Sequence, residues 1–334
     1  MGKITIPDFD SVMLRNYRNA LMGISIIYVI IFHFHPKGLL LNNIGKYGWT
    51  GVDMFFYLSA IGLCYSLNSK SNILQFYRRR ISRIIPTWWF FLISVLAISI
   101  IVGKLHPSGI FEFLCYFTGL GWWLNGLFDN ALFVYYYEWY VPTLLFYYAI
   151  FPFFFFMSRR TLLFLTIIVS IGIEIMLRDN LCPSLHLSYP RLLSFMIGIL
   201  SFRYIFENSS KNKRIDHVNY ILFFISITSV LLAISHQISF NVFLSFIMPF
   251  VFYIFAIIIK YTKSSKLFSF LGSISLELYL VHIYWQLPTI NLGGIVVDGD
   301  LLLIPKILVC IIIALMLKYT VEIINKMVLR DWLT

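Results

Sequence analysis

The sequence predicts an all-α protein: a polytopic bundle of about ten transmembrane helices, with both termini in the cytoplasm. Two observations predict this fold class. First, 60% of the 334 residues are hydrophobic and only 12% are charged, and the mean hydropathy is +0.83, whereas soluble domains are about half apolar and a quarter charged. Second, the apolar residues occur in runs of roughly twenty, the length that a helix needs to cross the hydrocarbon layer.

The apolar runs follow one another without a linker or an internal repeat, so we expect one transmembrane domain over residues 1–334. A further aromatic, glycine-containing run at 110–137 is expected to be interfacial or re-entrant, with an eleventh span as the alternative. The ten expected spans lie near residues 20–36, 50–67, 84–103, 138–157, 161–177, 189–206, 218–236, 240–260, 267–287 and 302–325.

The positive charges agree with this topology. Lys and Arg prefer cytoplasmic loops, and with a cytoplasmic N-terminus most of the 26 fall on that side, at least two in every cytoplasmic connection. The net charge of +11 therefore indicates topology, and we expect no nucleic-acid partner. The four cysteines lack metal-ligand spacing, so we expect no metal site and no bound cofactor.

Ionisable residues inside apolar runs are functional candidates, because a charge at mid-bilayer costs roughly 3 kcal/mol. His33, in MGISIIYVIIFHF, is the foremost of them. A near-neutral imidazole is a natural general base for a hydroxyl, although an interfacial histidine bonded to a carbonyl or to headgroups also fits. His282, in LELYLVHIYW, leaves the same two interpretations open, with Tyr279 on its helical face.

Under the expected topology, six polar groups gather near the outer ends of their helices, which indicates a polar cavity that opens outward. They are His33, His35, Asp53, Glu138, Arg191 and His282. Asp53 could orient a histidine, pair with an arginine, or only complement the helix dipole in a first turn. Ser59 and Gly62, further along the same run, are interpreted as small residues that permit close helix packing.

Four arginines in FYRRRISRIIP form a basic cluster at the start of the third expected span. They are Arg78, Arg79, Arg80 and Arg83. Guanidinium groups bind phosphates bidentately, so the cluster is a candidate site for a nucleotide-bearing acyl donor. The alternative is a topogenic charge block that attracts anionic lipid headgroups.

Four segments together resemble acyltransferase family 3, ten-helix bacterial membrane proteins that usually O-acetylate sugars. The segments are VIIFHF ending at Phe34, GVDMFFYLSAIG (51–62), YRRRISRIIP (77–86) and LGSISLELYLVH (271–282). Two weaker matches are WYVPTLLFYYAIFP (139–152) and RLLSFMIGIL (191–200). The matches keep the family's order and spacing over nearly the whole chain.

The resemblance implies an O-acetyltransferase of the bacterial inner membrane, in contact with lipids. Acyl-CoA, most often acetyl-CoA, would be the co-substrate and would present its phosphates to the four arginines of the basic cluster. His33 would act as base on a hydroxyl of a cell-envelope or exported glycan, or of its lipid-linked precursor, with Asp53 orienting it or balancing charge. The acceptor side would be lined by His282, Glu277, Tyr279, Arg191 and Glu138.

One position departs from the family pattern. The family usually has an arginine eleven residues before the helix-one histidine, and this sequence has Met22 there. Arg18 and Arg15 lie further back, and either could reach the site along its aliphatic stem. Alternatively, this protein handles its donor differently.

Two other function classes remain open. A transporter or flippase would line its substrate path with such polar residues, although the sequence lacks the matching pair of broken helices expected of one. A non-catalytic relative is the second alternative, because of Met22. No Ser or Cys is a clear nucleophile, so direct acyl transfer is favoured over an acyl-enzyme.

Overall fold

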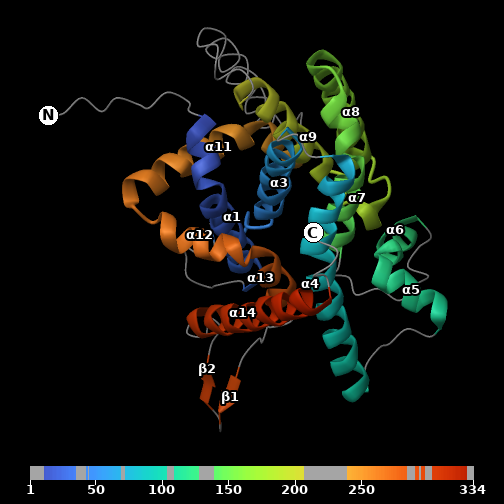
Figure 1. Ribbon diagram of the computed structural model, residues 1–334, viewed down its shortest axis with the longest axis vertical. Helices are drawn as coiled ribbons and strands as arrows, with labels where there is room; N and C mark the ends of the chain where they lie inside the picture. The colour runs from blue at the N-terminus through green and yellow to red at the C-terminus, as the bar shows by residue number, and fades with distance from the viewer. Residues whose placement is uncertain are drawn as a thin grey trace, which may run out of the picture.

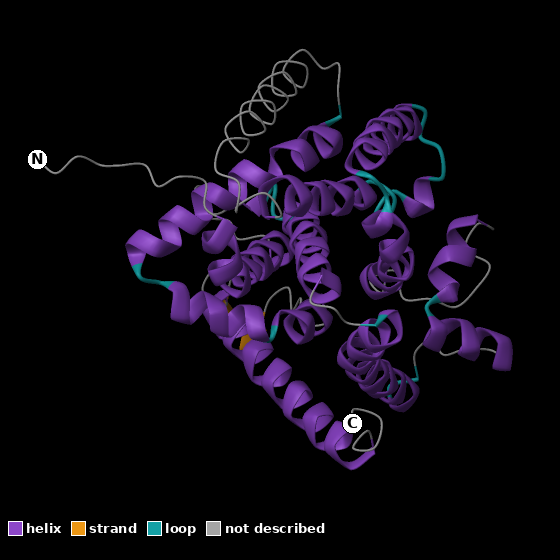
Figure 2. Cartoon of the chain, turned by 45° about the horizontal axis from the view of Figure 1, so that its top comes forward, coloured by secondary structure: helices purple, strands orange, loops and turns teal. Residues whose placement is uncertain are grey.

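The computed structural model describes residues 11–34, 43, 45–68, 72–103, 109–127, 139–206, 239–283, 290–292, 295–297 and 303–328. Helices make up nearly all of this part of the chain, and Figures 1 and 2 show them gathered into a bundle. A small antiparallel hairpin, β1 (Ile290–Leu292) with β2 (Ile295–Val297), is the exception to the predicted all-α class.

Six helices of the described chain are long and apolar enough to cross a membrane. They are α1 (Ser11–Phe34), α3 (Thr50–Asn68), α4 (Ile73–Ile101), α8 (Arg159–Arg178), α11 (Phe240–Thr262) and α14 (Leu303–Val328). A further apolar helix, α7 (Tyr140–Phe156), is shorter. The prediction of a multi-pass membrane protein is therefore confirmed.

The predicted number of ten spans is not confirmed. The expected sixth span is α9 (Arg191–Ser201) followed by a π-helical turn, η3 (Phe202–Phe206). The expected ninth span is two helices, α12 (Ser265–Ser273) and α13 (Ser275–His282), because a hydrophobic run does not reveal where the backbone leaves the helix. The expected seventh span, 218–236, lies outside the described residues.

Polar side chains begin several of these helices by accepting hydrogen bonds from backbone N–H groups that have no partner within the helix. Asn72 and Ser158 cap α4 and α8 in this way, at 3.2 and 3.1 Å. At the start of α11 the cap comes from another helix: the Glu174 carboxylate on α8 accepts from the Ser239 N–H at 2.9 Å. Glu174 therefore ties α8 to α11.

Helix α3 is the centre of the bundle. In its membrane-spanning window 83% of the residues are buried, against 22% in α8 and α14. It contacts α1, α4, α7, α9 and α11, and Figure 1 shows α1 and α9 beside it. Because α3 has neighbours on every side, polar residues on it face protein, whereas the exposed apolar faces of α8 and α14 suit contact with lipid.

Glycines allow α1 to cross α12 at very short range. A Cβ atom added to Gly23 on α1 would overlap the Phe268 carbonyl oxygen on α12. A Cβ added to Gly272 on α12 would overlap the Asn19 carbonyl oxygen on α1. Small residues at helix crossings in membranes permit this approach, so the backbones of α1 and α12 lie against each other at this point.

The break between α12 and α13 turns the chain into the bundle. Ile274 separates the two helices with φ −119° and ψ 18°, outside the helical region. From Glu277 to His282 every residue of α13 is then buried, and α13 contacts α1, α4 and α14. The break therefore brings the end of α13 against α1.

The aromatic run after α4 forms two short helices, α5 (Ile110–Thr118) and α6 (Leu120–Leu127). Gly119 separates them at φ +73°, a conformation that glycine adopts without strain. Neither helix is long enough for an eleventh span. Hydrogen bonds of 2.8 Å from the Trp89 indole to the Phe117 carbonyl and from the Trp122 indole to the Ser188 hydroxyl hold them against the bundle.

The glycine crossing predicts that Gly23→Ala destabilises the protein by about 1–3 kcal/mol, because the new methyl group forces α1 away from α12. Thermal unfolding of the purified protein in detergent measures the effect. Gly172→Ala in α8 is the matched control, since a Cβ there meets nothing within 4 Å. A Gly23→Ala protein as stable as the wild type would show that the two helices do not pack at this point.

Candidate functional site

Two histidines from different helices face each other in the bundle. His33 is next to the last residue of α1, and His282 is the last residue of α13. Their ring centroids are 5.0 Å apart. The His282 side chain is fully buried, and its Nδ1 lies 2.7 Å from the Tyr279 carbonyl oxygen. Because a carbonyl only accepts, Nδ1 carries the proton, and Nε2, which has no hydrogen-bond partner, is left as a base.

Three arginines converge on one pocket that is lined by α1, α3, α4, α7 and α13. Arg18 comes from α1, and Arg80 and Arg83 come from α4. Met22 and Ser275 also line this arginine pocket. The Arg80 guanidinium lies 5.8 Å from the Phe76 ring centroid, and its buried Nε has no hydrogen-bond partner. The pocket therefore concentrates positive charge and has donor capacity for an anion.

Arg18 enters the pocket because α3 leaves room for it. Its Nε donates to the Leu58 carbonyl oxygen at 3.0 Å. A Cβ added to Gly62 would lie 2.5 Å from the Arg18 Nη2. Gly62, predicted to allow helices to pack closely, thus makes space for a guanidinium, and Ser59 lines the pocket.

The basic cluster of α4 is divided by the rotation of the helix. Arg80 and Arg83, three residues apart, share a face that lines the pocket. Arg78 and Arg79 are exposed and lie outside the pocket. Of the four arginines predicted to bind the donor, the structure therefore brings Arg80 and Arg83 into the pocket and leaves Arg78 and Arg79 outside it.

Aromatic side chains connect the arginine pocket to the two histidines. Tyr140 and Phe55 line the pocket, and the Tyr140 ring lies 4.1 Å from that of Tyr279, centroid to centroid. The Tyr279 ring in turn lies 5.3 Å from that of His282. A continuous line of side chains thus leads from the cationic pocket to the imidazoles.

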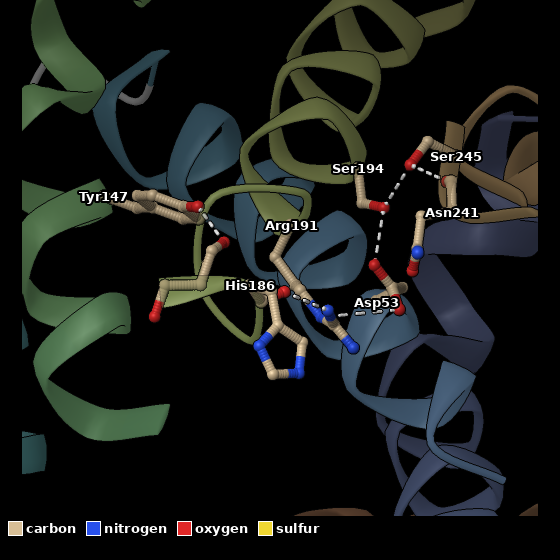
Figure 3. Close-up of polar contacts among 8 residues, drawn as sticks. Asp53, Tyr147, His186, Arg191, Ser194, Asn241 and Ser245 are labelled. Carbon is tan, nitrogen blue, oxygen red and sulfur yellow. Dashed lines mark hydrogen bonds and ion pairs between the residues drawn. The ribbon is translucent and has the colours of Figure 1, made fainter. Parts of the chain in front are cut away.

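Asp53 forms a buried ion pair with Arg191. Its Oδ2 lies 3.7 Å from the Arg191 Nε, and both side chains are at most 6% exposed. Its Oδ1 accepts a hydrogen bond from the Ser194 hydroxyl at 3.2 Å, and this hydroxyl is 2.8 Å from that of Ser245. Figure 3 shows this network, which joins α3, α9 and α11. Of the roles open to Asp53, the structure supports pairing with an arginine.

The Arg191 guanidinium is enclosed by aromatic rings. It lies 5.6 Å from the Trp49 ring centroid and 5.5 Å from that of Trp139, and its Nη1 donates to the His186 carbonyl oxygen at 3.2 Å. His186 follows the short helix η2 (Pro183–Leu185). Cation–π contacts, a carboxylate and a carbonyl together replace the water that a buried guanidinium loses.

The remaining predicted acceptor-side residues fall in different places. Tyr279 and His282 lie together near His33. Glu277 is buried in the first turn of α13, two residues before Tyr279 and two residues after Ser275, which lines the arginine pocket. Arg191 belongs to the ion pair described above. Glu138, like His35, lies outside the described residues.

Some residues of the site were not identified from the sequence. Tyr140 and Ser194 occur in two segments noted only as weaker family matches, and Ser245 occurs in an unremarked apolar run. A serine in an apolar helix is a weak signal, because hydroxyls there often bond to their own backbone. Ser245 does so as well, donating to the Asn241 carbonyl oxygen at 3.1 Å. Their partners are visible only in three dimensions.

Among the residues that the structure describes, no three His, Cys, Asp or Glu side chains are grouped so that they could hold a metal ion.

Comparison with known proteins identifies the family of this protein. Residues 16–322 match the model of acyltransferase family 3, an acyltransferase domain. The match covers most of the chain, so the protein belongs to this family, as its motifs predicted, and is a membrane acyltransferase. No curated protein and no solved structure is similar enough to match.

The ion pair predicts strong energetic coupling between Asp53 and Arg191. Asp53→Asn and Arg191→Gln should each destabilise the protein by about 3–5 kcal/mol, because each leaves a buried charge unpaired. The double variant should lose clearly less than the sum. Thermal unfolding in detergent measures all three proteins, with exposed Asp179→Asn as the control. Additive losses would show that the pair is not coupled.

Proposed function

We propose that this protein is a membrane-bound O-acyltransferase. It transfers an acyl group, most often acetyl, from acyl-CoA to a hydroxyl group. The hydroxyl belongs to a cell-envelope or exported glycan, or to the lipid-linked precursor of that glycan. One observation carries the proposal: the same two helices reach both the arginine pocket and the histidines. Met22 and His33 are on α1, and Ser275 and His282 are on α13.

The distance between the arginine pocket and the histidines suits a long donor molecule. At about 1.5 Å per residue, the helix axis covers roughly 16 Å between Met22 and His33 and roughly 10 Å between Ser275 and His282. Acyl-CoA has its phosphates at one end and its thioester at the other, joined by the extended pantetheine arm. The donor can therefore be held by the arginine pocket while its thioester lies near the imidazoles.

Arg18, Arg80 and Arg83 hold the phosphates in this proposal. Guanidinium groups form paired, charge-assisted hydrogen bonds with phosphate oxygens. The family usually has an arginine at the position of Met22. Arg18 takes that place on α1, since both side chains line the pocket. Acyl-CoA is made in the cytoplasm, so the arginine end of the bundle faces the cytoplasm. The positive-inside rule gives the same orientation for a bacterial inner-membrane protein.

The reaction needs one base and one positioned thioester. His33 removes the proton from the acceptor hydroxyl, and the oxygen attacks the thioester carbonyl carbon. A carbon–oxygen bond forms and the carbon–sulfur bond breaks. The departing thiolate takes the proton back from the His33 imidazolium, which yields the acyl ester and free CoA.

His282 and Tyr279 line the acceptor side next to His33. Nε2 of His282, which has no hydrogen-bond partner, accepts a hydrogen bond from the incoming sugar. This hydrogen bond positions the sugar hydroxyl for His33. Asp53 and Arg191 act as positioning residues, because their pair joins α3, which carries Phe55, to α9.

For this function, His33→Ala should lower acyl transfer at least ~100-fold while donor binding remains, because only the proton-transfer step is lost. The acylation state of the host's surface glycans, measured by mass spectrometry, reports the activity. His186→Ala is the matched control, since that histidine is exposed in a loop after α8.

Full acylation in cells that carry His33→Ala, at normal protein level, would remove the general-base assignment. A transporter or flippase would continue to move its substrate in the same variant. Glycans that show no difference with and without the gene would contradict the acceptor class.

The division of the basic cluster predicts different effects of neighbouring arginines. Arg18→Gln, Arg80→Gln and Arg83→Gln should each weaken acetyl-CoA binding about 10- to 100-fold, because each removes charged hydrogen bonds to phosphate. Arg79→Gln, with the same change of charge outside the pocket, should leave the affinity unchanged. Equilibrium binding to the purified protein measures all four variants.

Met22→Arg added to the Arg18→Gln variant should restore affinity, since both positions line the same pocket. If Arg79→Gln weakens binding as much as Arg80→Gln does, the cluster acts only through its overall charge.

A further inference from the structure

Three aromatic side chains lie between the arginine pocket and the histidines. Phe55 on α3 and Tyr140 on α7 line the pocket, and Tyr279 on α13 lies beyond them, next to His282. The Phe55 ring centroid is 6.2 Å from that of Tyr140 and 6.5 Å from that of Tyr279. Each ring therefore contacts the other two, and we refer to these three residues as the aromatic barrier.

The aromatic barrier is tightly closed. The centroids of Tyr140 and Tyr279 are 4.1 Å apart, a separation at which two rings touch. Phe55, Tyr140 and Tyr279 are only 3%, 5% and 4% exposed. The rings come from three helices, α3, α7 and α13, and pack against one another.

The walls around the barrier are also filled. Ile84 and Leu144 line the pocket beside it and are 3% and 4% exposed. In the proposed function the donor arm extends from the arginines towards the imidazoles along these three rings, so its acyl group lies next to Tyr279, whose ring is 5.3 Å from that of His282. The space that the rings leave sets the size of that acyl group.

We propose that the aromatic barrier of Phe55, Tyr140 and Tyr279 selects the length of the acyl chain and restricts transfer to short chains. This inference rests on the proposed function and assigns specificity to residues that do not bind the phosphates. A pocket discriminates by about 10- to 200-fold for each methylene that does not fit. Replacing a ring by a small side chain opens space that several methylenes can fill.

The test compares acetyl-CoA with hexanoyl-CoA on the purified full-length protein. The polysaccharide fraction of the host cell envelope serves as acceptor, and released CoA thiol is measured. The wild type should use acetyl-CoA at least about 10-fold faster than hexanoyl-CoA. Tyr140→Ala should raise the hexanoyl-to-acetyl ratio by at least about 10-fold, and Tyr140→Phe, which keeps the ring, should leave the ratio as it is.

A second position keeps the inference testable if Tyr140→Ala does not fold. Phe55→Leu, which removes a ring but remains apolar, should shift the ratio in the same direction. If the hexanoyl-to-acetyl ratio is unchanged in both folded variants, the aromatic barrier does not select chain length. The same follows if the wild type uses both donors equally. In either case the proposed function stands. A wild type that releases no CoA from any donor overturns the proposed function, and the barrier with it.

Discussion

The buried ion pair of Asp53 and Arg191 is the interaction on which the centre of this bundle depends. An unpaired charge is very unfavourable in an apolar interior, so each of these residues requires the other. Asp53 is on α3, the most buried of the six long apolar helices, and Arg191 begins α9. The Ser194 and Ser245 hydroxyls extend the network to α11. The network therefore holds α9 and α11 against α3, and α3 lines the arginine pocket through Phe55 and Ser59.

This central framework allows two unlike chemical environments to occur in one bundle. The arginine pocket is cationic and gathers guanidinium groups from α1 and α4. The histidines lie at the other end of α1, where His282 is fully buried and one of its nitrogens is bare. An imidazole can exchange protons near neutral pH, whereas a guanidinium remains charged and holds anions. The aromatic side chains between the two regions keep them separate while placing them within reach of one extended molecule.

The sequence drew attention to single residues, and only the structure shows which side chains lie next to them. His33 and His282, far apart in the chain, lie with their ring centroids 5.0 Å apart. The spacing of Arg80 and Arg83 shows that they share a helical face. It does not show that these two arginines, rather than Arg78 and Arg79, face the inside of the bundle. For Asp53 the sequence allowed three roles. The choice depended on Arg191, which belongs to another helix.

By itself, the sequence determined that this is a helical membrane protein of acyltransferase family 3. Apolar run length and short motifs are local properties, and the bilayer imposes helices on such runs. Only the tertiary structure decided that α12 and α13 are separate helices, that Arg18 lies beside Met22 in the arginine pocket, and that Asp53 pairs with Arg191. The physical reason is that each depends on how helices rotate and pack against one another, which a linear pattern of hydrophobic residues does not encode.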